Sequence, residues 1–127
     1  MPHCQLHGMT DLSEFHTRFR PRSIQTGEWI LKAEESFLSS RGRSLLLECL
    51  TLEGYLRQSF FVLITLDEEG AMVRLLPRTS PEKTEGVKRC LAWIALWLQA
   101  LGPGAVVGRT NLQDQLQLPL PPEAIPR

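Results

Sequence analysis

The clearest hydrophobic pattern in the chain is a series of three segments rich in strand-forming residues. They cover residues 43–52, 55–66 and 71–77, and short polar turns at Glu53-Gly54 and Asp67–Gly70 separate them. Valine, isoleucine, phenylalanine and threonine favour extended structure. Connections this short join neighbouring antiparallel strands. The pattern therefore predicts an antiparallel meander.

Residues 28–38 are compatible with two structures. Ile30, Ala33 and Phe37 have the spacing of a helical face, and the composition of this segment is helix-forming. Read instead as a strand, the segment has one face formed by Trp29, Leu31, Ala33 and Phe37. We favour the strand, so the predicted meander has three to four strands.

Residues 81–101 have the signals of one long helix. Ser80 is the expected N-cap, Pro81 suits the first helical position, and residues 102–104 contain two glycines that end the helix. Apolar residues cover more than half of its circumference: Val87, Cys90, Leu91, Trp93, Ile94, Ala95, Trp97, Leu98 and Leu101. A sheet buries an arc of only about 100–140° of a helix, so the edge formed by the two tryptophans needs a second partner.

A shorter helix is expected near the N-terminus. Leu12, Phe15 and Phe19 lie on one face, Thr10 or Asp11 can cap the helix, and a proline at position 21 ends it. The helix has an apolar face to pack on the sheet.

The two ends of the chain lack such periodicity. We expect residues 1–9 to form a flexible N-terminal tail and residues 111–127, rich in proline, leucine and glutamine, to form an extended C-terminal tail. Residues 105–110 suit a short strand. The prediction is one α+β domain over residues 10–110, in which an antiparallel meander is preceded by a short helix and crossed by a long one.

The predicted sheet carries apolar residues on both faces. Phe60, Val62 and Ile64 lie on one face of their strand, and Phe61 and Leu63 lie on the other. An antiparallel sheet with one face in water alternates more cleanly. Two explanations are open: the first helix and the tail cover the surplus apolar surface, or that surface contacts a second copy or another protein.

Composition and charge narrow the function classes. The chain has 14 basic and 14 acidic residues and a formal net charge of zero, so its overall charge favours neither nucleic acid nor membranes. Cys4, Cys49 and Cys90 are widely spaced, which favours a reducing compartment. The N-terminus has no signal-peptide pattern, and no apolar run reaches the ~20 residues of a membrane span. We expect a cytoplasmic protein without a cofactor.

One cluster has the residue types of a metal site. His3, Cys4 and His7 have a spacing that zinc sites use. No second ligand pair follows them, and a start at Met9 would delete all three. A metal site is therefore only a third-ranked alternative, together with an enzyme.

The main alternative function is binding of single-stranded nucleic acid on the sheet. It is suggested by arginines near aromatic residues, because arginines contact phosphates and aromatic rings stack on bases. These arginines are Arg18, Arg20, Arg22, Arg43 and Arg57.

The sequence has no nucleophile elbow, phosphate-binding glycine loop or dinucleotide fingerprint. We therefore predict a non-catalytic adaptor that binds a protein partner or forms a homo-oligomer. Its expected interface combines the edge of Trp93 and Trp97 with the sheet face of Phe61 and Leu63. Arg89, four positions before Trp93, is expected to stack on that indole.

Overall fold

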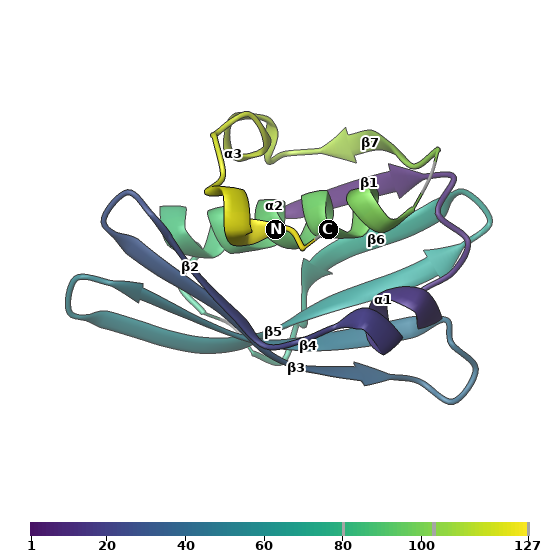
Figure 1. Cartoon of the computed structure of the whole chain (residues 1–127), viewed down its shortest axis with the longest axis horizontal. Helices are drawn as coiled ribbons and strands as arrows, with labels where there is room; N and C mark the ends of the chain where they lie inside the picture. Colours follow the sequence, from purple (N-terminus) through teal and green to yellow (C-terminus); the bar gives the residue numbers. More distant parts are fainter. Residues whose placement is uncertain (80, 103, 127) are drawn as a thin grey trace.

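A computed structural model describes residues 1–79, 81–102 and 104–126 of the chain. In this part of the chain, seven strands form one antiparallel sheet in the order β2-β3-β4-β5-β6-β1-β7. The sheet curls around one long helix (Figure 1). The strands are β1 (His3–His7), β2 (Arg22–Thr26), β3 (Trp29–Leu38), β4 (Ser44–Glu53), β5 (Leu56–Asp67), β6 (Gly70–Leu75) and β7 (Val106–Thr110). The helices are α1 (Ser13–Arg18), α2 (Glu85–Leu101), α3 (Gln113–Leu116) and the 3-10 turn η1 (Pro122–Ala124).

The α+β class and the antiparallel meander are confirmed, and the segment of residues 28–38 forms β3. The predicted number of three to four strands is too low. β2 was missed because Ile24 is its only large apolar residue, and this strand is stabilised by pairing with β3. No helix in the described residues is long and apolar enough to cross a membrane.

The first residues form a strand within the sheet, in place of the flexible tail that the sequence predicted. β1 pairs with β6 on one side and with β7 on the other. Cys4 and Leu6 point into the core and are fully buried. The polar residues His3, Gln5 and His7 gave this segment the composition of a tail, whereas its stability comes from two neighbouring strands that are distant in sequence.

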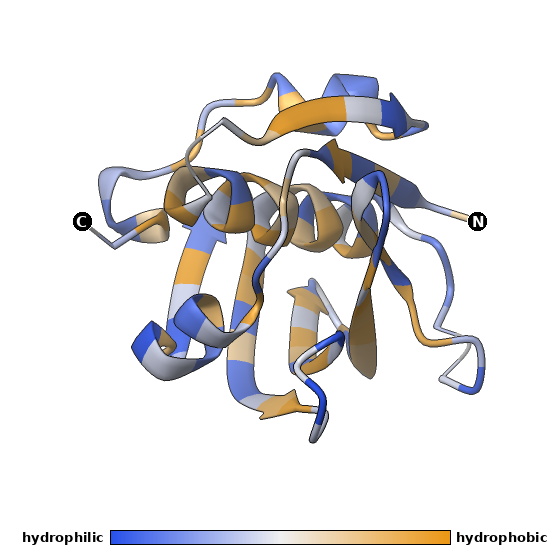
Figure 2. Ribbon diagram, turned by 90° about the vertical axis from the view of Figure 1, so that its right-hand side faces the viewer, coloured by the Kyte–Doolittle hydropathy of each residue, from blue (hydrophilic) through white to orange (hydrophobic). Residues whose placement is uncertain are grey.

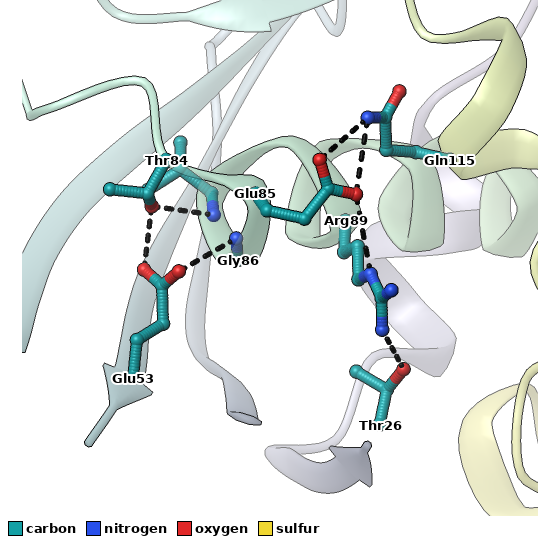
Figure 3. Close-up of polar contacts among 8 residues, drawn as sticks. Thr26, Glu53, Thr84, Glu85, Gly86, Arg89 and Gln115 are labelled. Atoms are coloured by element: carbon teal, nitrogen blue, oxygen red, sulfur yellow. Dashed lines mark hydrogen bonds and ion pairs between the residues drawn. The ribbon is translucent and has the colours of Figure 1, made fainter. Parts of the chain in front are cut away.

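The long helix α2 begins four residues later than its sequence signals suggest. Thr84 is the N-cap, and its hydroxyl oxygen accepts a hydrogen bond of 3.3 Å from the N–H of Val87. The carboxylate of Glu53 on β4 also accepts hydrogen bonds from the Thr84 hydroxyl at 2.5 Å and the Gly86 N–H at 2.9 Å (Figure 3). The expected cap, Ser80, lies outside the described residues.

Both sides of α2 are covered within the chain. The curled sheet packs on one side, and apolar residues follow most of the helix inside the curl (Figure 2). On the other side, the Trp97 ring contacts Phe15 and Phe19, with centroid distances of 5.1 and 5.5 Å. Trp93 lies 5.6 Å from Trp97 and donates to the C-terminal segment. The N-terminal helix and the tail therefore explain the surplus apolar surface of the helix.

Candidate interaction surface

The tryptophan edge of the expected interface is not available to a partner. Trp93 is 0 % exposed and Trp97 is 1 % exposed, because α1 and the C-terminal segment cover them. The sequence pattern correctly required a second partner for this edge, and that partner is the chain itself. The two indoles therefore belong to the core.

Arg89 also faces inward. Its guanidinium carbon lies 4.2 Å from the centre of the Trp29 ring, and its Nη1 donates a hydrogen bond of 3.0 Å to the Thr26 hydroxyl. Glu85 pairs with the same guanidinium at 3.4 Å and accepts a hydrogen bond from Gln115 (Figure 3). The expected stacking on Trp93 is wrong, since Arg89 joins α2 to the β2–β3 hairpin.

The remaining half of the expected interface lies on the convex face of the sheet. Phe61 and Leu63 on β5 point away from α2, because Phe60, Val62 and Ile64 fill the concave core. Leu63 pairs with Leu46 on β4, and Leu46 pairs with Phe37 on β3. We call Phe37, Leu46, Phe61 and Leu63 the convex patch.

The convex patch is open to solvent in the described part of the chain. Phe37 is 49 % exposed, its ring centre lies 6.4 Å from that of Phe61, and the other three side chains are partly exposed. Figure 1 shows that α2, α3 and β7 lie on the concave side of β3, β4 and β5, which is the side away from the convex patch. Three neighbouring strands thus present a continuous apolar surface to water.

A register shift in β3 places Phe37 on this surface. The pairing of β3 with β4 shifts between Ala33 and Glu35, where one extra residue forms a bulge. Without the bulge, Phe37 would share the concave face with Ala33, as the sequence reading assumed. The most exposed member of the convex patch was therefore assigned to the wrong face.

The arginines of the alternative function do not form one surface. Arg18 pairs with Glu14 on α1, Arg20 donates to the backbone carbonyl of Phe19, and Arg22 donates to that of Glu123. Arg43 bonds the carbonyl of Leu66, near the last residue of β5, whereas Arg57 lies near the first residue of that strand. A nucleic-acid strand would have to reach opposite ends of the sheet to contact both.

The three residues of the candidate metal site point in two directions. His3 and His7 lie on one face of β1, and Cys4 lies on the other face, fully buried in the core. One ion cannot contact all three. Elsewhere in the described chain, no group of three or more histidine, cysteine, aspartate or glutamate side chains has a metal-binding arrangement.

The fold creates one polar pair that the sequence did not indicate. His16 on α1 lies 2.8 Å from the hydroxyl of Ser36 on β3, measured from Nδ1 to Oγ. Twenty residues separate them, and no short motif connects them. Ser36 is buried, and its N–H bonds the Glu35 carboxylate. The pair joins α1 to the sheet, and its buried hydroxyl is poorly placed to meet a substrate.

Searches with family models, among curated proteins and among solved structures find no match to the chain.

Proposed function

We propose that this protein is a non-catalytic interaction module that binds protein through the convex patch. Phe61 and Leu63 belong to this surface, together with Phe37 and Leu46. The observation that carries the proposal is the continuous apolar surface across β3, β4 and β5, which no helix of the described chain covers. Trp93, Trp97 and Arg89 are not part of it.

The physical chemistry of the convex patch supports a protein partner. Burial of apolar surface contributes about 25 cal/mol per Å², and two aromatic rings side by side provide much of the area that a contact centre needs. A sheet face is also a rigid platform, because strand pairing fixes the backbone under all four side chains. Binding here costs little ordering entropy.

Site-specific photo-crosslinking in cells tests this proposal. A benzophenone analogue of phenylalanine replaces Phe37 in one version of the chain and Tyr55 in another. Tyr55 is fully exposed at the tip of the β4–β5 hairpin, away from the convex patch, so it controls for random encounters. Adducts to protein at position 37 and few at position 55 are expected. Equal yields at both positions would contradict the proposal.

A further inference from the structure

Charged residues on β3, β4 and β6 lie beside the residues of the convex patch. Glu35 on β3 and Glu48 on β4 are directly opposite each other on the convex face. Arg74 on β6 is exposed and pairs with Leu63, at the other side of the patch. The apolar residues therefore separate two carboxylates from one guanidinium.

None of these charged side chains forms an ion pair within the described part of the chain. Like charges directly opposite each other on neighbouring strands destabilise a sheet. Glu35 accepts one hydrogen bond, from the N–H of the next residue, and neither Glu35 nor Glu48 forms an ion pair. Arg74 forms neither a hydrogen bond nor an ion pair with any described residue. Each side of the convex patch thus presents a charge that an opposite charge from outside would balance.

From this pattern we infer that the convex patch binds a second copy of the chain about a two-fold axis that runs along the strands between β4 and β5. The strand order β3-β4-β5-β6 means that this axis exchanges β3 with β6 and β4 with β5. Arg74 of the second copy then faces β3 beside Glu35, and Leu46 faces Leu63. The symmetry produces each pairing twice.

The dimer rests on the proposed function, since it names the partner of the same surface. The two copies do not repel each other through their overall charge, because the formal net charge is zero. Glu35 on β3 and Arg74 on β6 lie at the border of this interface, as charges at protein interfaces commonly do, whereas Glu48 on β4 pairs with Phe61 and lies nearer the centre. Two sheets that meet through such faces pack about 10 Å apart.

Charge exchange between two variants tests the second copy directly. We compare the wild-type chain, Arg74→Glu, and Glu35→Lys by light scattering after size exclusion, over a concentration series. The wild-type chain should reach twice its monomer mass of 14.4 kDa. Each variant alone should dissociate at least about tenfold more readily, because like charges then face each other across the axis.

An equimolar mixture of the two variants should recover the wild-type affinity. In the mixed dimer, the new carboxylate at position 74 of one copy lies beside the new amine at position 35 of the other, and on the other side of the axis the native Arg74 lies beside the native Glu35. Arg18→Glu, an exposed change on α1, is the matched control and should dimerise like the wild-type chain. Far-UV circular dichroism checks that every variant is folded.

Two results would overturn the second copy as partner: a wild-type monomer at every concentration, or variants whose mixture associates no better than each alone. The proposed function has a separate outcome. Position 37 adducts to other proteins, together with a wild-type monomer, would remove the dimer and keep the contact surface. Failure of the crosslinking at position 37 would remove the contact surface itself.

Discussion

The indole N–H of Trp93 donates a hydrogen bond of 2.8 Å to the backbone carbonyl oxygen of Ala124. Thirty-one residues separate the two partners, and both are buried. This bond fixes the C-terminal segment on the side of α2 that the sheet does not cover. It explains why an indole that the sequence suggested for an interface lies in the core.

Trp93→Phe should therefore destabilise the protein. Phenylalanine keeps most of the apolar volume but cannot donate to Ala124, whose carbonyl is then left without this partner. We expect the free energy of unfolding in urea to fall by about 1–3 kcal/mol. Trp29→Phe is the control, because it alters only a cation–π contact at a partly exposed site and should cost about 0.5–1 kcal/mol. Equal losses would contradict the role of the Trp93 bond.

The contact between Glu53 and Gly86 should show as energetic coupling. Glu53→Ala removes an acceptor at the N-terminus of α2 and should cost about 1–3 kcal/mol. Gly86→Ala should also destabilise, because its β-carbon would lie 2.5 Å from Cδ of Glu53.

The sign of the Gly86→Ala effect should change when Glu53 is absent. In the Glu53→Ala background the clash disappears, and the better helix propensity of alanine, about 1 kcal/mol, becomes visible. Urea unfolding of the two single variants and the double variant measures this cycle. Strictly additive effects would show that the Glu53 side chain does not limit position 86.

Adjacent residues on β5 should lose very different amounts of stability on the same substitution. Leu63 lies on the convex face and Ile64 is fully buried in the concave core. Leu63→Lys should change the free energy of unfolding by no more than about 1 kcal/mol, whereas Ile64→Lys buries an unpaired charge and should cost more than about 4 kcal/mol. Thermal unfolding followed by circular dichroism separates the two. Similar losses would place Leu63 in the core.

The buried thiols should make stability sensitive to alkaline pH. The adjacent Cys90 thiol and then burial raise the pKa of Cys49 well above its usual range, and burial raises the pKa of Cys4. In the unfolded chain both thiols ionise near pH ~8.5, so above this pH the unfolded state binds fewer protons than the folded state. The free energy of unfolding should therefore be fully maintained below this pH and fall as the pH rises above it.

Urea unfolding at about pH 7 and about pH 10 measures this fall, with Cys4→Ala/Cys49→Ala as the comparison. The double variant should lose less stability between the two pH values than the wild-type chain does. If both lose the same amount, other groups cause the alkaline dependence.

Local patterns predicted the elements that carry their own signals. The strands β3 to β6 and the helices α1 and α2 were predicted because strong periodicity or short turns mark them. β1 and β2 were missed because their stability comes from neighbours that are distant in the chain, such as β6 beside β1. The same reason explains the burial of Trp93, since its partner Ala124 lies near the other end of the sequence.

The candidate surface was predicted in part. Alternation in β5 identified Phe61 and Leu63 correctly as the second face of the sheet. Phe37 was assigned to the opposite face, because a bulge between Ala33 and Glu35 reverses every later residue of β3. A single extra residue in a strand is set by its pairing partner, and the one-dimensional pattern does not record it.

The central claim is that the convex patch is a contact surface for protein. Its most direct test is the yield of photo-adducts at position 37 with and without Leu63→Lys in the same chain. We predict that this second change lowers the yield at least about tenfold while the free energy of unfolding stays nearly constant. An unchanged yield would show that the encounter at position 37 does not depend on the convex patch, which would contradict the account.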